Sequence, residues 1–210
     1  MASQGGREGG VWFFTSCTLN AYYNEHDAWA AAWLRELIRQ GLITDGTVDE
    51  RDIQEVKTAD LAGYGRHHFF SGIAGWELAL HLAGWPADRP VWTGSCPCQP
   101  FSPAGKGEAE EDGRHLWPAW FSLIRECRPD CLVGEQVASR AGYRWLDGVR
   151  TDLESEGYAF GAADLPAACV GSPHIRQRLF WVAQSEGEGR TRMESERTNG
   201  KCKRARSGSN

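Results

Sequence analysis

Residues 67–84 read HHFFSGIAGWELALHLAG, and this stretch decides the fold. Residues 67–70 form a short predicted strand, and the small residues at 71–75 predict a tight turn. A helix is predicted to follow up to Gly84, a typical helix stop, and its apolar residues are Trp76, Leu78, Ala79, Leu80, Leu82 and Ala83. A strand, a turn and a helix in this order are the unit from which parallel sheets are built. The stretch therefore predicts an α/β protein.

The same alternation extends in both directions along the chain. Amphipathic helices are predicted over 28–39, 116–127 and 145–156, and short strands over 91–93, 131–134, 158–165 and 179–182. Residues 44–60 are acidic and are predicted to form a loop around one apolar step at 53–56. The alternation favours a mostly parallel sheet with helices on both faces.

Length and composition indicate a single folded domain. The 210 residues suffice for one core, and ten tryptophans supply large side chains for it. We expect a flexible tail over 1–10, one domain over 11–183 and a polar, disordered tail over 184–210. That last stretch holds four acidic and seven basic residues, and Met193 is its only larger apolar side chain.

Charge and cysteine content narrow the class of protein. The net charge of −5 gives no global basic field, so binding to nucleic acid would need a local basic surface. No window approaches eighteen uncharged apolar residues, and residues 1–10 have no apolar signal core, so we expect a cytoplasmic protein without a membrane span. Seven cysteines, an odd number, do not form a disulfide framework.

The sharpest local signal is GSCPCQPFS at residues 94–102, where a predicted strand ends. Pro97 and Pro100 flank Cys98 and stiffen the loop. Ligands bind at the carboxyl ends of strands in such folds, and a thiol there suits a nucleophile. A buried structural cysteine is the alternative. Cys96 and Cys98 with two later cysteines could also hold a metal, but the spacings are not those of zinc knuckles, so we expect none.

Three further motifs have functional and ordinary readings. The small residues at 70–75 would let a cofactor approach the backbone, although such turns are common. Glu135, in GEQV after a predicted strand, is either a substrate-binding acid or a capping or solvated one. In HIRQRLF at 174–180, Arg176 and Arg178 would project to one side if the segment is extended, and solvated arginines are the alternative.

Taken together and in this order, the four motifs resemble the cytosine-C5 DNA methyltransferase family. FSGIAG resembles its cofactor motif, GSCPCQPFS its Pro-Cys-Gln nucleophile motif, and GEQVAS its Glu-Asn-Val motif with Gln136 in place of Asn. Residues 157–183 resemble the stretch that ends in its paired arginines. The resemblance covers about residues 20–183. It implies a Rossmann-like fold and a methyltransferase activity that uses S-adenosylmethionine (S-adenosyl-L-methionine) as its cofactor. The catalytic domain would comprise residues 11–183.

The resemblance also implies a role for each motif. Cys98 would add to C6 of a cytosine flipped out of DNA, and Glu135 would bond N3 and the exocyclic amine of that base. Arg176 and Arg178 would hold the base O2 and a phosphate, and Gln99 and Ser102 would contact the substrate. The cofactor contacts implied are Phe70, Ser71, Gly72, Ile73, Gly75, Glu25, Asp52, Ile53 and Pro97.

The order of the cofactor motifs departs from the family. Only 28 positions separate Phe70 from Cys98, too few for the two cofactor elements that the family places there. YYNEHD at 22–27 resembles the ribose-binding acid motif, and DIQEV at 52–56 resembles the adenine-side motif. We therefore predict that the second and third strands precede the first along the chain. His68 stands where the family has an aspartate.

Residues after Ala183 lack the apolar content of the target-recognition domain and final helix of family members. Three functions therefore stay open. The chain is a DNA (cytosine-5-)-methyltransferase, a catalytically incomplete half-enzyme that needs a second protein chain for target recognition, or an RNA cytosine methyltransferase.

Overall fold

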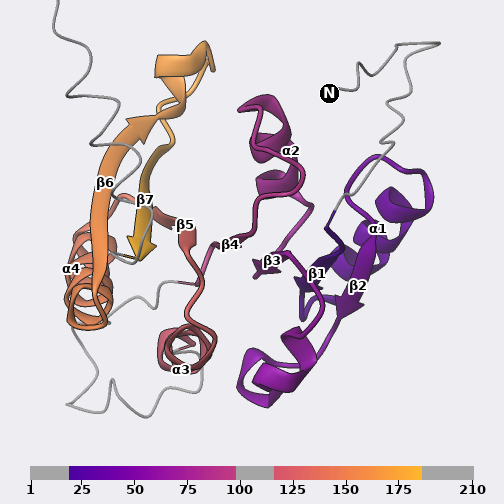
Figure 1. Ribbon diagram of the computed structural model, residues 1–210. Helices are drawn as coiled ribbons and strands as arrows, with labels where there is room; N and C mark the ends of the chain where they lie inside the picture. The colour runs from indigo at the N-terminus through magenta and orange to yellow at the C-terminus, as the bar shows by residue number, and fades with distance from the viewer. Residues whose placement is uncertain (1–18, 98–115, 186–210) are drawn as a thin grey trace, which may run out of the picture.

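The structure is a computed structural model, and it describes residues 19–97 and 116–185 (Figure 1). Its strands are β1 (Ala21–Asn24), β2 (Gly46–Asp49), β3 (Arg66–Phe69), β4 (Val91–Gly94), β5 (Cys131–Val137), β6 (Tyr158–Pro166) and β7 (Gln177–Ser185). Its helices are α1 (Ala28–Arg39), α2 (Gly75–Leu82), α3 (Trp117–Cys127) and α4 (Arg140–Ser155), with short 3-10 turns η1 (Ile53–Glu55), η2 (Thr58–Leu61) and η3 (Ala167–Val170). The predicted tail at 1–10 and residues 186–210 lie outside the described residues, whereas 184–185 belong to β7.

All seven strands form one sheet in the order β2-β1-β3-β4-β5-β7-β6. The first five are parallel to their neighbours, and β7 runs antiparallel between β5 and β6. Helices α1 and α2 cover one face, and α3 and α4 cover the other (Figure 1). The prediction of a mostly parallel sheet with helices on both faces is confirmed.

The sheet has the rearranged strand order that the motifs predict. β3, which leads into the 70–75 turn, lies in the middle of the sheet, with β1 beside it and β2 beyond. Counting β3 as the first strand, β1 as the second and β2 as the third gives the doubly wound order 3-2-1-4-5. The strands keep their places while their connections change.

Residues 44–60 are not the loop predicted from the sequence. β2 pairs with β1 from Gly46 to Asp49, and η1 and η2 follow it. The strand was missed because GTVD is a short, partly exposed edge strand without apolar alternation. Helix α4 begins at Arg140 rather than at 145, because the Ser139 side chain accepts a hydrogen bond from the Gly142 amide at 3.0 Å and caps it.

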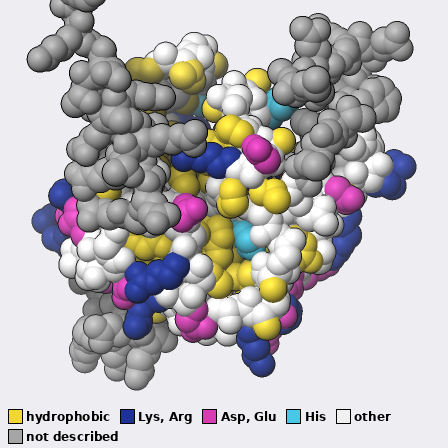
Figure 2. Space-filling view, viewed as in Figure 1, with side chains coloured by type: hydrophobic (Ala, Val, Ile, Leu, Met, Phe, Trp, Pro, Cys, Tyr) yellow, Lys and Arg dark blue, Asp and Glu magenta, His cyan; other side chains and the backbone are white. Residues whose placement is uncertain are grey.

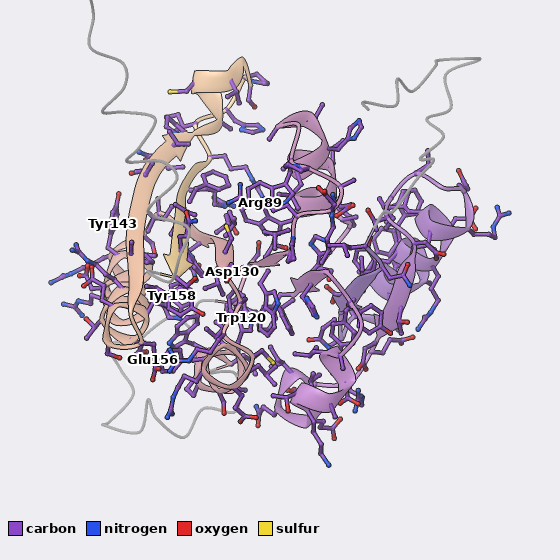
Figure 3. All side chains as sticks on the ribbon, in the orientation of Figure 1. Arg89, Trp120, Asp130, Tyr143, Glu156 and Tyr158 are labelled. Atoms are coloured by element: carbon purple, nitrogen blue, oxygen red, sulfur yellow. The ribbon has the colours of Figure 1, made fainter. Side chains whose placement is uncertain are left out.

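The main core lies between the sheet and α3 and α4, and it is rich in tryptophan. Trp120, labelled in Figure 3, comes from α3 and has ring-centroid distances of 5.7 Å to Phe69 and 5.9 Å to Trp181. A Cβ on Gly94 would lie 2.5 Å from the Trp120 ring, and one on Gly134 would lie 2.1 Å from the Trp181 ring. The ends of β4 and β5 are thus packed directly onto this core, which fixes the backbone that leads to the candidate site.

Candidate active site

Parallel strands β1 to β5 bring their carboxyl ends to one edge of the sheet. The register pairs Asn24 with Phe69, Phe69 with Gly94, and Gly94 with Gly134. Residues that follow these positions in the chain, including the 70–75 turn, therefore meet at this edge. Ligands bind at such an edge in doubly wound folds.

The 70–75 turn is held against the end of β1. Gly72 donates its amide hydrogen to Glu25 Oε2 at 2.6 Å, and the Ser71 amide donates to the Asn24 carbonyl at 3.1 Å. Phe70 and Ala74 have φ values of 52° and 68°, a left-handed conformation that is strained for residues with a side chain. The turn is compact, and a Cβ built on Gly72 would meet nothing within 4 Å.

Asp52 and Ile53 follow β2 on the other side of β1. Asn24 Nδ2 donates to the Arg51 carbonyl at 2.9 Å and so ties the end of β1 to this segment. Asp52 caps η1 by accepting the Gln54 amide at 2.9 Å. The Ile53 side chain is buried in the main core, so any ligand contact there would come from its backbone.

His68, which stands where the family has an aspartate, faces away from this edge into a buried polar cluster under α2. Its Nε2 lies 2.9 Å from Glu77 Oε2 and its Nδ1 lies 2.7 Å from Thr93 Oγ1. Arg66 Nη1 lies 2.6 Å from Glu77 Oε1, and the Thr44 hydroxyl donates to the same oxygen. The sequence analysis missed this cluster, whose signal is two polar residues on one face of a buried strand.

The electrostatics of the cluster keep Glu77 charged. Burial would raise the pKa of this carboxyl, but hydrogen bonding and charge from His68, hydrogen bonding from Thr44 and the charge of Arg66 lower it from 4.5 to about 2. The Glu77 carboxylate is therefore buried and paired, and the cluster connects α2, and with it the 70–75 turn, to the sheet.

Glu135 and Arg178 come together from β5 and β7. Val137 pairs with Arg178 in the antiparallel ladder, and Arg178 Nε lies 2.7 Å from Glu135 Oε1. Both side chains are about one-fifth exposed, so the pair is open to a ligand from one side.

Arg176 does not join this pair as an extended segment would require. It has a φ of 35°, is exposed, and lies one residue before β7 begins at Gln177. The condition under which Arg176 and Arg178 would project to one side, an extended segment, is therefore not met, because the chain turns at Arg176.

Gln136, which replaces the family's Asn, connects β5 to the segment before the predicted nucleophile. Its buried Nε2 donates to the Cys96 carbonyl at 3.0 Å, and its Oε1 accepts the Val137 amide at 2.8 Å. Pro97 is exposed and is the last residue described before the gap. Cys98, Gln99 and Ser102 lie outside the described residues.

Comparison with known proteins identifies the family of this chain. The family model described as C-5 cytosine-specific DNA methylase matches residues 86–206, more than half of the chain. The chain belongs to the C-5 cytosine-specific DNA methylase family.

Several curated members of the DNA methylase family are similar in sequence. Type II methyltransferase M.AluI of Cellulosimicrobium cellulans is 36% identical over 134 residues, which cover 58% of this chain and 25% of that protein. M.HhaI of Haemophilus parahaemolyticus is 25% identical over 167 residues, covering 61% of this chain and 51% of that protein. This DNA methylase chain thus spans between a quarter and about half of these two relatives.

A solved structure supports the fold of this DNA methylase. The crystal structure of a Spodoptera frugiperda DNMT2 mutant covers 80% of this chain and 43% of its own, with a TM-score of 0.53 and 16% sequence identity. At this identity the likeness concerns the fold alone.

Trp76 is a further residue at the candidate site, which no motif in the sequence indicates. Its Nε1 donates to Ser95 Oγ at 3.1 Å, and its ring meets the Phe180 ring edge-on at 6.2 Å. Trp76 therefore links the first turn of α2 to the segment after β4 and to β7. An aromatic residue directly after the glycine turn was the available signal.

The part of the chain that the structure describes contains no group of metal ligands and no helix that could span a membrane. Within residues 19–97 and 116–185, no three His, Cys, Asp or Glu side chains are grouped as metal ligands. No helix in those ranges combines the length and the apolar character that crossing a membrane requires.

Proposed function

We propose that this chain is the catalytic part of a DNA (cytosine-5-)-methyltransferase, which transfers a methyl group from S-adenosylmethionine to C5 of cytosine through a covalent intermediate on Cys98. The observation that supports this most is the Glu135–Arg178 ion pair beside the Gln136 hydrogen bond to Cys96. An acid and a guanidinium are thereby held at the strand edge next to the segment that leads, two residues later, to Cys98.

The chemistry begins with Cys98, because C5 of cytosine is a poor nucleophile. The thiolate adds to C6, and the S–C6 bond makes C5 an electron-rich enamine carbon. C5 then takes the methyl group, and the electron pair of the broken methyl–sulfur bond stays on the cofactor sulfur. Water takes the C5 proton, and the electrons of the C5–H bond break the S–C6 bond and regenerate the thiolate. The base must leave the DNA stack for Cys98 to reach C6, so the substrate is DNA with a flipped cytosine.

Glu135 and Arg178 would recognise the flipped base together. Glu135 would accept a hydrogen bond from the exocyclic amine and share a proton with N3, which becomes basic as the thiolate adds to C6, and this stabilises the enamine. Arg178 holds the Glu135 carboxylate with its Nε and donates from Nη1 to the Gln177 carbonyl at 2.8 Å, and its Nη2 would donate to the base O2. Arg176, exposed at the turn before β7, would contact a neighbouring phosphate rather than the base.

The residues of the cofactor edge fit S-adenosylmethionine, which would supply an electrophilic methyl group. The Glu25 carboxylate can accept hydrogen bonds from ribose hydroxyls, since each of its oxygens keeps acceptor capacity beyond the Gly72 and Asp27 amides. Open space at Gly72 and Gly75 lets the ligand approach the turn. Phe70, Ser71, Ile73, Asp52, Ile53 and Pro97 complete the proposed contacts.

Glu25→Gln is expected to weaken S-adenosylmethionine binding by about 10- to 100-fold, because charge-assisted hydrogen bonds to the ribose would become neutral ones. Titration calorimetry measures the change. Glu55→Gln is the matched control, since Glu55 is exposed on η1 close to the same edge. An unchanged dissociation constant in Glu25→Gln would remove Glu25 from the cofactor site.

The decisive experiment incubates the chain with S-adenosylmethionine and long random-sequence DNA that contains 5-fluorocytosine. Fluorine cannot leave as a proton does, so the reaction stops with the protein bonded to C6, and intact-mass analysis detects the adduct. We expect the adduct in the wild type and in Cys169→Ser, which changes an exposed cysteine, and no adduct in Cys98→Ser.

The other outcomes overturn specific parts of the proposal. Adduct with 5-fluorocytosine RNA in preference to DNA would make the chain an RNA cytosine methyltransferase. Cofactor binding without any adduct would show that this chain needs a second protein chain that supplies target recognition. Failure of both cofactor binding and adduct would refute the activity for this chain.

A further inference from the structure

An apolar groove of about 830 Å³ lies between α1 and α2, on the sheet face opposite the tryptophan core. Its main walls are formed by large apolar side chains, namely Trp33, Leu37, Leu42, Leu78, Leu82 and Trp85. Figure 2 shows hydrophobic side chains at the surface over α2. The charged side chains in its lining, Arg66 and Glu77, are paired with each other, so they do not oppose an apolar occupant.

The groove walls contain apolar side chains that do not pack against the sheet. Helix α1 buries Ala30, Ala31 and Leu34 against the sheet, yet presents Trp33 to the groove. On α2, Leu78 and Leu82 are 58% and 76% exposed. Contiguous apolar surface of this kind marks an interaction site. The groove is therefore expected to have an occupant.

The described chain begins at the rim of this groove. The Leu19 amide donates to the Ala87 carbonyl at 3.5 Å, and Ala87 lines the groove. The Leu19 side chain lies against Gly65, where a Cβ would come within 2.2 Å of it. Leu19 itself, to which the preceding residues are joined, therefore lies at the Ala87 side of the groove.

The preceding residues also have the composition that the groove requires. Residues 11–14 are Val-Trp-Phe-Phe, four consecutive large apolar residues without charge. The link from Phe14 to Leu19 spans up to about 17 Å when extended. Helix α2 has 8 residues and is about 12 Å long, so the segment can reach along it.

The other end of the chain is a poorer candidate. Ser185, the last described residue, donates its amide to the Asp130 carbonyl just before β5, where Cys131 packs in one cluster with Leu80 of α2 and Trp85. Residues 186–210 contain Met193 as their only larger apolar side chain and are rich in charge. The composition of the two segments therefore favours the amino-terminal one.

We propose that residues 11–14 of this chain dock into the groove between α1 and α2 and complete the core on that face of the sheet. The proposal does not depend on the methyltransferase activity, because it concerns the packing of α1 and α2.

A photo-crosslinking experiment on the full chain tests this placement. Leu82 is replaced by p-benzoylphenylalanine, the protein is irradiated, and peptide mass spectrometry maps the product. An equal mixture of ¹⁴N- and ¹⁵N-labelled protein separates crosslinks within one chain from crosslinks between two. We expect crosslinks within one chain between position 82 and residues 11–14. The same probe in place of Val170, which is 87% exposed on η3, should give none of them.

Hydrogen exchange gives a second readout that does not need the probe. Trp12→Asp with Phe13→Asp should raise the exchange rate of the α2 amides by about tenfold, because charge keeps the segment out of the groove. Thr15→Asp with Ser16→Asp adds the same charge to the same segment and should leave α2 unchanged. Circular dichroism confirms that each variant is folded.

Two results would overturn the proposal. Crosslinks from position 82 only between chains would show that a second copy occupies the groove. The second result is an exchange rate of the α2 amides that is the same in the wild type and in Trp12→Asp with Phe13→Asp, together with the absence of any crosslink to 11–14. It would show that the amino-terminal segment does not dock.

Discussion

Glu77→Gln is expected to lower the free energy of unfolding by about 3–5 kcal/mol, because it removes one partner from a buried ion pair. Arg66 and His68 would lose the carboxylate that lies within 3 Å of each of them. A desolvated guanidinium without a counter-charge is among the most costly defects in a protein interior. Urea unfolding at pH 7, with linear extrapolation to water, measures the difference.

Glu154→Gln is the matched control for this prediction. Glu154 forms an exposed i,i+4 pair with Arg150 at 2.8 Å on α4, so the same substitution in a helix should change stability by less than about 0.5 kcal/mol. Equal losses in the two variants would contradict the view that burial makes the Glu77 pair important.

The pH dependence gives the same prediction a second test. Because the pKa of Glu77 is lowered from 4.5 to about 2 in the folded state, its stabilisation is present above pH 4.5 and is lost as the pH falls toward 2. The difference between wild type and Glu77→Gln should therefore shrink below about pH 4.5. Burial lowers the pKa of His67 from 6.5 to about 4. Both proteins should therefore lose stability as the pH falls from about 6.5 to about 4.

Glu135→Gln is expected to lower the rate of methyl transfer by about 10²- to 10³-fold, the effect of removing one preorganised group that stabilises the transition state. The amide cannot present two acceptor oxygens to Arg178 and to the exocyclic amine at once. Single-turnover transfer of labelled methyl to DNA measures the rate, and DNA affinity should change far less. Glu126→Gln, at an exposed position near the end of α3, is the control.

The ion pair predicts non-additive effects on that rate. Arg178→Lys keeps the charge but loses the planar fork that reaches Glu135 at 2.7 Å. Because the two side chains act as a unit, the double variant should lose little more activity than Glu135→Gln alone. A double variant whose loss equals the product of the two single losses would indicate that they act independently.

The sequence predicted the units of the fold because each has its own periodic pattern. The strand and helix around the 70–75 turn, and the rearranged order of the cofactor strands, follow from residues that are close in the chain. β2 was missed because an edge strand such as Gly46–Asp49 needs no apolar alternation. Its pairing with β1 is visible only in three dimensions.

The parts of the site that depend on distant partners could not be predicted. Nothing in the sequence indicates that the Glu77 carboxylate pairs with the His68 ring, or that Gln136 donates a hydrogen bond to the Cys96 carbonyl 40 residues away. The conformation at Arg176 is another case, since alternate arginines are compatible with a strand until the backbone turns. Local patterns thus located the motifs, and tertiary contacts decided which side chains meet.

The rearranged strand order separates two tasks along the chain, cofactor binding and base handling. Every proposed cofactor contact lies between Glu25 and Pro97, and the proposed base-handling residues follow from Cys98 to Arg178. The two tasks therefore occupy consecutive stretches, joined in the sheet by the β4–β5 ladder from Trp92–Leu132 to Gly94–Gly134. A single recombination point after Pro97 could exchange one task while retaining the other, provided that the tryptophan core beneath this ladder is kept.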